Sequence, residues 1–116
     1  MEQGAELGRI STHVLDVARG RPGAGIEVVL ARQDETGWVE VARATTNADG
    51  RTDAALAEGD ALRVGVHEIR FAVGAYFAGE GFLDTVPVRF RVDDAGGHYH
   101  VPLLCSPWSY STYRGS

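Results

Sequence analysis

Hydrophobic and polar residues alternate with a period of two in several short runs of the chain, as in β-strands with one buried face. In the first run, residues 9–18, Ile10 and Val14 share one face, and Ser11 and His13 share the other. The other runs with this pattern cover residues 26–32, 38–46, 62–73, 86–92, 98–104 and 109–114. The pattern therefore predicts seven or eight short strands.

Segments rich in glycine, proline, asparagine and aspartate separate these runs and indicate turns. They cover residues 19–25, 34–37, 47–51 and 93–97. Only residues 74–82 indicate a short helix, although this segment contains glycines that weaken helices. Short strands joined by turns at regular spacing are typical of an all-β fold, so we expect an antiparallel β-sandwich of seven to eight strands with one short helix.

The composition is that of one compact domain. The chain has 116 residues, 44% of them hydrophobic, and a net charge of -5. The eleven basic residues are all arginines and are scattered among sixteen acidic ones, which argues against a nucleic-acid partner. We expect a single domain over residues 1–116, with a flexible N-terminus over residues 1–8.

The single cysteine and the start of the chain bear on its compartment. Cys105 cannot form an intramolecular disulfide, and its apolar neighbours indicate a small buried strand residue and not an activated thiol. The first residues lack a basic segment followed by an apolar run, and no apolar stretch approaches the roughly 20 residues that span a bilayer. We therefore expect a cytoplasmic protein with no membrane partner.

Three histidines on predicted strands and one arginine after a turn are candidates for chemistry: His13, His98, His100 and Arg51. Histidine can move a proton in either direction near neutral pH, and arginine can hold a carbonyl or anionic oxygen through paired donors. A structural role remains open for each histidine alone. A metal site is a further alternative, but no carboxylate or cysteine accompanies the histidines at metal-ligand spacing. The chain also lacks a Gly-x-Ser-x-Gly motif and a phosphate-binding loop.

Several motifs together resemble the 5-hydroxyisourate hydrolases of the transthyretin family. They are "STHVLDVARGRPGAGIEVVLAR" from residue 11, "GW" at 37–38, "TTNADGR" at 45–51, "YF" at 76–77, "HYHVPLL" at 98–104 and the closing "SPWSYSTYRGS". The resemblance covers the chain from about Ile10 to Ser116. Its last four residues, Tyr-Arg-Gly-Ser, are the ending that separates these hydrolases from the hormone-carrying transthyretins.

The resemblance implies a homotetramer of β-sandwiches, with active sites in clefts where two dimers meet. It places catalytic residues at His13, Arg51 and His100, and substrate-binding residues at Tyr113, Arg114, Gly115 and Ser116. It implies no metal and no cofactor. The implied substrate is 5-hydroxyisourate, and the implied product of ring opening is 2-oxo-4-hydroxy-4-carboxy-5-ureidoimidazoline. His98 lies outside the set that the resemblance assigns.

General chemistry is compatible with these implied roles. A neutral histidine can activate water, and Arg51 can stabilise an oxygen that gains negative charge. The residues do not decide which of His13 and His100 is the base. The chain departs from the family pattern at Cys105 and at Trp108-Ser109. These differences lie outside the implied catalytic set, so we expect them to affect packing between subunits more than the chemistry. A transthyretin-type ligand carrier and a structural β-sandwich module are the rival classes.

Overall fold

A computed structural model describes residues 7–116 of the protein. Residues 1–6 of the N-terminal segment expected to be flexible lie outside the described residues. Gly8, just before the first strand, is buried, and its carbonyl accepts a hydrogen bond of 3.0 Å from the backbone N–H of Gly59. No helix in residues 7–116 has the length and apolar character needed to cross a bilayer.

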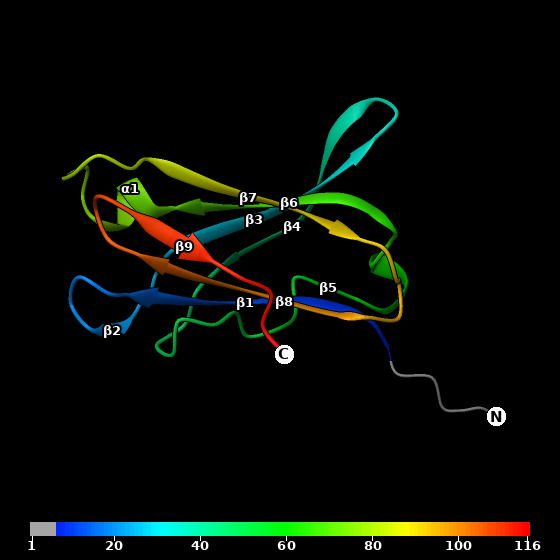
Figure 1. Ribbon diagram of the computed structural model, residues 1–116, viewed down its shortest axis with the longest axis horizontal. Coiled ribbons are helices and arrows are strands. Elements are labelled where there is room, and N and C mark those ends of the chain that lie inside the picture. Colours follow the sequence, from blue (N-terminus) through cyan, green and yellow to red (C-terminus); the bar gives the residue numbers. More distant parts are fainter. Residues whose placement is uncertain (1–6) are drawn as a thin grey trace.

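The described residues form two packed β-sheets (Figure 1). The strands are β1 (Arg9–Asp16), β2 (Arg21–Pro22), β3 (Glu27–Asp34), β4 (Gly37–Thr45), β5 (Ala57–Glu58), β6 (Gly65–Ala72), β7 (Thr85–Val92), β8 (His98–Cys105) and β9 (Tyr110–Thr112). A 3-10 turn, η1, covers Gly59–Ala61, and a single-turn helix, α1, covers Val73–Tyr76. The predicted all-β sandwich with one short helix is confirmed, and β2 and β5 add two strands of only two residues each.

The first sheet has the order β2-β1-β8-β9, with β5 also paired to β1, and the second has the order β4-β3-β6-β7. All pairs are antiparallel except β1 with β8, which run parallel in register from Arg9↔His98 to Asp16↔Cys105. The predicted antiparallel sandwich is thus confirmed for every strand pair but this one. The difference arises because alternation reveals the faces of a strand and carries no information about the direction of a distant partner.

The alternation predicted along the chain becomes burial between the two sheets. In β1 the even-numbered residues are buried and the odd-numbered ones are more exposed, as predicted. Ile10 and Val14 from the first sheet meet Leu30, Ile69 and Phe71 from the second in one apolar core. Burying such a side chain contributes about 1.5–3 kcal/mol to folding, so this core fixes the inward face of β1 and leaves its other face for the site.

The predicted helix over residues 74–82 is much shorter than expected. Only Val73–Tyr76 is helical, and the chain then passes through positive φ at Ala78, Gly79 and Gly81. A left-handed conformation cannot continue a right-handed helix, and glycine adopts it without steric cost. The left-handed turn that ends the helix therefore begins at Ala78, and Gly79 and Gly81 continue the chain in conformations that a helix cannot adopt.

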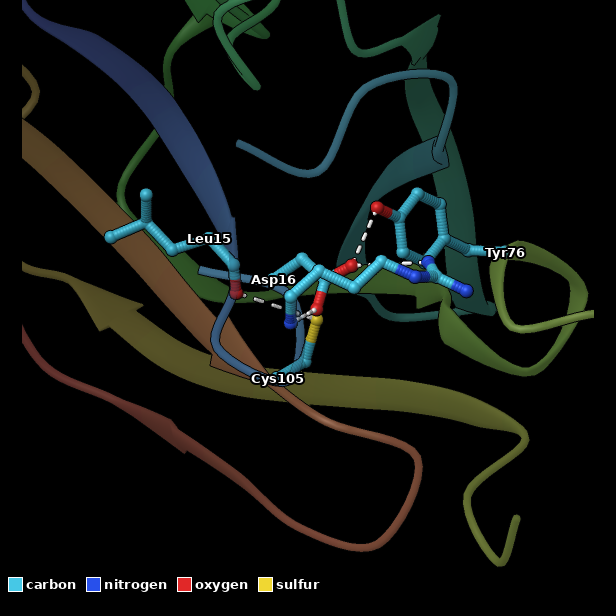
Figure 2. A network of polar contacts seen from close by, with 5 residues as sticks. Leu15, Asp16, Tyr76 and Cys105 are labelled. Carbon is cyan, nitrogen blue, oxygen red and sulfur yellow. Dashed lines mark hydrogen bonds and ion pairs between the residues drawn. The ribbon is translucent and has the colours of Figure 1, made fainter. Parts of the chain in front are cut away.

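A buried carboxylate links the end of β1 to α1 (Figure 2). Tyr76 Oη donates a hydrogen bond of 2.8 Å to Asp16 Oδ2, and Arg19 forms an ion pair of 3.2 Å with the same oxygen. Although burial alone would raise it, the pKa of Asp16 is lowered overall by its bonds to Tyr76 and Arg19. Tyr76 and Arg19 thus stabilise the negative charge of the buried Asp16 carboxylate.

Cys105 lies beneath this carboxylate (Figure 2) and is fully buried. Its thiol donates a long hydrogen bond of 3.7 Å to the Leu15 carbonyl. Burial, with a smaller contribution from the Asp16 carboxylate, raises the thiol pKa to about 11. The prediction of a small buried strand residue is confirmed, because a thiol with this pKa stays protonated near neutral pH.

Candidate active site

The candidate site lies on the outer face of the first sheet, where β1 and β8 run side by side (Figure 1). Residues that alternate with the buried ones must face away from the core, which places Ser11 and His13 of β1 and His100 of β8 on this face. Two isolated bridges add distant segments to it. His13 pairs with Arg51 from the turn before β5, and His100 pairs with Gly115 from the C-terminal tail.

The turn over residues 47–51 positions Arg51 beside β1. Asn47 Oδ1 accepts hydrogen bonds from the backbone N–H groups of Asp49, at 2.9 Å, and Arg51, at 3.2 Å. Gly50 has a φ of 78°, a conformation that glycine adopts readily, and its carbonyl accepts a 2.8 Å bond from the Val14 N–H. The "NADGR" sequence is therefore a rigid turn docked on the first strand.

His13 is held by the same turn. Its Nε2 lies 2.9 Å from the carbonyl oxygen of Asp49. A carbonyl can only accept, so Nε2 carries the proton and Nδ1 is the nitrogen with the free lone pair when the ring is neutral. This contact fixes the orientation and the tautomer of His13.

His100 is half-buried and lies across the strand pair from Ser11, its register partner. Its Nδ1 is 2.8 Å from Ser11 Oγ. Burial is the largest cause that lowers the His100 pKa, and the positive charges of Arg51 and His13 lower it further. The ring is therefore neutral at pH 7, which is the state that can accept a proton.

The C-terminal tail packs directly on His100. The Gly115 N–H donates a 2.7 Å hydrogen bond to the His100 carbonyl. A Cβ atom at position 115 would lie 2.6 Å from His100 Cδ2, closer than Cβ atoms approach other groups in proteins. Glycine at this position thus permits the tail to lie against the imidazole, and the tail then brings Ser116 to the site.

These residues enclose a polar pocket of about 350 Å³ on the sheet surface. It is lined by Arg9, Ser11, Arg51, His98, His100 and Ser116. This volume is at the lower end of the range for small-molecule sites. Its two guanidinium groups, two imidazoles and two hydroxyls suit a small ligand rich in carbonyl or anionic oxygens.

The site residues expected from the resemblance divide into two groups. Arg51, His100 and Ser116 line the polar pocket, with Gly115 packed behind His100. His13 lies at the pocket's border, bridged to Arg51, and does not line it. The resemblance therefore grouped Arg51, His100 and Ser116, which are far apart in the chain and line one pocket.

Tyr113 and Arg114 lie outside the polar pocket. They border a separate, mainly apolar pocket of about 290 Å³ between β7 and β9. The Arg114 guanidinium stacks 4.3 Å from the centre of the Tyr99 ring and donates a 3.0 Å hydrogen bond to the His98 carbonyl. Arg114 thus anchors the tail to β8. The Tyr113 side chain is 60% exposed, so most of its surface has no contact within one chain.

Two pocket residues, Arg9 and Ser11, were missed by the sequence reasoning. Both precede His13 on the same face of β1 at spacings of two, so the alternation that exposed His13 also exposed them. That periodicity was the available signal. His98 also lines the pocket, although its Nε2 donates a 3.2 Å hydrogen bond to the Leu7 carbonyl.

Residues 7–116 contain no group of three histidine, cysteine, aspartate or glutamate side chains placed to hold a metal ion. His13 and His100 each use one ring nitrogen in a hydrogen bond with this chain. The arrangement consists of proton acceptors and cationic donors around a small cavity. Such a set can orient a planar polar molecule, activate water and stabilise a developing oxyanion.

Comparison with known proteins assigns the chain to a family. The profile of the HIUase/Transthyretin family matches residues 10–115. A 5-hydroxyisourate hydrolase of Ralstonia nicotianae is 50% identical over 95% of this chain and 100% of its own length.

Solved structures agree with this assignment. An (S)-allantoin synthase is 40% identical with a TM-score of 0.89 over the whole of this chain, which spans 46% of that longer chain. A 5-hydroxyisourate hydrolase of Klebsiella pneumoniae, 34% identical, has a TM-score of 0.81 over 94% of this chain and 99% of its own. A transthyretin of Sparus aurata, 26% identical, has a TM-score of 0.85 over 92% of this chain and 96% of its own. The chain therefore belongs to the HIUase/Transthyretin family.

Proposed function

We propose that this protein is a 5-hydroxyisourate hydrolase, which opens 5-hydroxyisourate to 2-oxo-4-hydroxy-4-carboxy-5-ureidoimidazoline in urate degradation. The observation that carries the proposal is a neutral, half-buried His100 beside Arg51 in one small polar pocket. This pocket occurs in a chain 50% identical, over nearly its full length, to a protein of that name.

The pocket chemistry suits the reaction. Water adds to a ring carbonyl carbon, the carbonyl oxygen gains negative charge, and the adjacent ring C–N bond then breaks. One proton of the water is returned to the leaving nitrogen, and the attacked carbon becomes a carboxylic acid, which releases its proton to solvent. In this proposal His100 faces the water, while Arg51 holds the oxygen that becomes negative.

The remaining predicted residues have supporting roles in the proposal. His13 assists proton transfer from the border of the pocket, where its positive charge lowers the pKa of His100. Ser116 holds substrate or water through its hydroxyl, and Gly115 and Arg114 keep the tail in place. Tyr113 contributes to a substrate site only when a second subunit completes it. No metal or cofactor takes part in the proposed reaction.

We also propose that the protein is a homotetramer with its active sites in clefts where two dimers meet. The polar pocket opens outward on the first sheet, and Trp108, Tyr110 and Tyr113 are 69%, 43% and 60% exposed around β9. Exposed aromatic side chains are enriched at interfaces. Sedimentation equilibrium should give four times the chain mass of 12.4 kDa, and an active monomer would contradict the proposed assembly.

We propose a cytoplasmic location, which the buried free thiol of Cys105 supports, because free thiols persist in reducing compartments. Fractionation of the source cells, with antibody detection, checks it. Recovery of the protein outside the cytoplasmic fraction would contradict this location and leave the proposed reaction unaffected.

The first experiment measures the decay of 5-hydroxyisourate absorbance, with the substrate formed in situ from urate by urate oxidase. The protein should accelerate decay well above the spontaneous rate. Arg51→Ala should lower kcat by about 10² or more, as loss of an oxyanion donor does. Arg63→Ala, which changes an exposed arginine outside the pocket, is the matched control. Spontaneous decay in the presence of folded protein would favour a transthyretin-type binder.

A further inference from the structure

The hydrogen bond between Ser11 and His100 has a chemical consequence for the proposed reaction. Ser11 and His100 are register partners on the parallel strands β1 and β8, and the Oγ to Nδ1 distance is 2.8 Å. A parallel pair in continuous register on both sides of this point holds the two side chains opposite each other. The contact is thus built into the sheet and does not depend on a mobile loop.

The surroundings of His100 indicate which nitrogen carries the proton. The two cationic groups that line the same pocket, Arg9 and Arg51, can only donate hydrogen bonds. In residues 7–116 the Nε2 atom of His100 has no hydrogen-bond partner, whereas Nδ1 has Ser11. In a pocket lined by two guanidinium groups, a lone pair on Nε2 is electrostatically favoured over an N–H.

We propose that Ser11 is a positioning residue: its hydroxyl oxygen accepts the Nδ1–H of His100 and so holds the Nε2 lone pair toward the pocket. Ser11 itself lines the pocket, so its own O–H remains free to donate to water or substrate. When His100 takes a proton from water, the same contact becomes a charge-assisted hydrogen bond, which is stronger than a neutral one. Ser11 therefore stabilises the imidazolium that forms during the reaction.

This inference rests on the proposed function for its kinetic consequences, but the tautomer can be measured without turnover. Nitrogen-15 NMR of histidine-labelled protein, with His100 assigned through His100→Gln, should show a protonated Nδ1 and an unprotonated Nε2 near pH 8. A protonated Nε2 in the wild-type protein would overturn the inference, even if the protein is an active hydrolase. If the expected tautomer is observed but the protein has no hydrolase activity, the proposed function is contradicted and the inference about the tautomer stands.

Kinetics of two Ser11 variants separate positioning from packing. Ser11→Ala should lower kcat by about tenfold, with a smaller change in KM, because the lost contact is strongest in the charged transition state. The acid limb of its pH profile should move to lower pH, since the protonated ring loses an acceptor. Ser11→Thr keeps the hydroxyl and should restore both properties.

A control variant completes the test. Thr45→Ala removes an exposed hydroxyl from β4 in the other sheet and should leave kcat and the pH profile unchanged. Wild-type kcat and an unshifted acid limb in Ser11→Ala would overturn the inference. So would a Ser11→Thr variant that folds normally and is as slow as Ser11→Ala.

Discussion

Arg9 places a second guanidinium group in the pocket that contains Arg51 and His100. Arg9 is exposed at the start of β1, two residues before Ser11 on the same face, so it can contact a ligand without reorganising the core. A planar substrate with several carbonyl oxygens offers an acceptor to each of two arginines. Because Arg51 is proposed to hold the oxygen that becomes negative, we expect it to stabilise the transition state. We expect Arg9 to bind a different carbonyl oxygen and so to affect substrate affinity.

Arg9→Gln should raise KM about tenfold and change kcat little, because a charged hydrogen bond present equally in the ground and transition states affects binding alone. Steady-state kinetics over a range of substrate concentrations measure the two constants separately. A fall in kcat at unchanged KM would contradict this division of roles and place Arg9 with Arg51 in charge stabilisation.

The lowered pKa of His100 predicts the acid limb of the pH profile. Burial and the charges of Arg51 and His13 disfavour the imidazolium, so the pKa of His100 lies below the value of about 6.5 of an unperturbed histidine. The midpoint of the acid limb of kcat/KM should therefore lie below pH 6.5. Arg51→Ala should move the remaining acid limb upward, since one positive charge near His100 is lost. An acid limb above pH 6.5 in the wild-type enzyme would contradict this prediction.

The position of the C-terminal tail depends on the absence of a side chain at Gly115. Gly115 pairs with His100 through its N–H, and a Cβ atom there would lie 2.6 Å from His100 Cδ2. Gly115→Ala should therefore displace either the tail or the imidazole and lower kcat/KM by at least about tenfold, as small misplacements of catalytic groups do. Thermal unfolding should change little, because the tail lies outside the buried core.

Gly96→Ala is the matched control for this prediction. Gly96 lies in the exposed turn before β8, where an added Cβ meets only the Asp94 carboxylate oxygen at 3.4 Å. It should retain wild-type kinetics. If Gly115→Ala is also fully active, the tail does not control the position of His100.

At the scale of strands and turns, local pattern was sufficient for the existence and inward face of most elements. Ile10 and Val14 are buried and His13 faces outward because side chains alternate on every strand. The parallel pairing of β1 with β8 could not be predicted from alternation, since residues 9–16 and 98–105 are joined only by tertiary contacts. The contact of Ser11 with His100 depends on that pairing, which explains why it was missed.

The C-terminal tail shows what a sequence motif leaves undetermined. The resemblance implies one site for Tyr113, Arg114, Gly115 and Ser116. Within one chain, Tyr113 and Arg114 border the apolar pocket, Ser116 lines the polar pocket, and Gly115 packs on His100. A motif therefore identifies the residues, and the backbone path decides which of them one subunit can bring to the same ligand.

At the scale of the whole molecule, one buried side-chain nitrogen among the described residues has no hydrogen-bond partner, and it lies between the sheets. His67 of β6 is fully buried, its Nδ1 donates a 3.1 Å hydrogen bond to the Gly65 carbonyl, and its Nε2 has no partner. Its ring stacks on Phe90, with centroids 5.8 Å apart. Burial lowers the His67 pKa, and the positive charge of Arg32 lowers it further. The folded protein therefore holds this histidine in its neutral form.

This buried neutral histidine should make folding sensitive to mild acid. The unfolded chain binds a proton at His67 near pH 6.5 and the folded protein only at lower pH, so the free energy of unfolding should fall as pH decreases below about 6.5. One proton contributes a slope of at most about 1.4 kcal/mol per pH unit. The carboxylates of Asp16 and Glu68, whose pKa values are lowered, act in a separate window below pH 4.5.

His67→Leu should reduce the dependence of the free energy of unfolding on pH between 7 and 5, and the part due to His100, whose pKa is also lowered, should remain. Leucine fills the apolar site without a titratable group, although it loses the bond to Gly65, so the prediction concerns the slope and not the absolute stability. Urea unfolding at fixed protein concentration and several pH values measures it, with His98→Gln, an exposed histidine, as the control. Equal slopes for wild type and His67→Leu would mean that His67 is protonated in the folded protein as readily as in the unfolded chain.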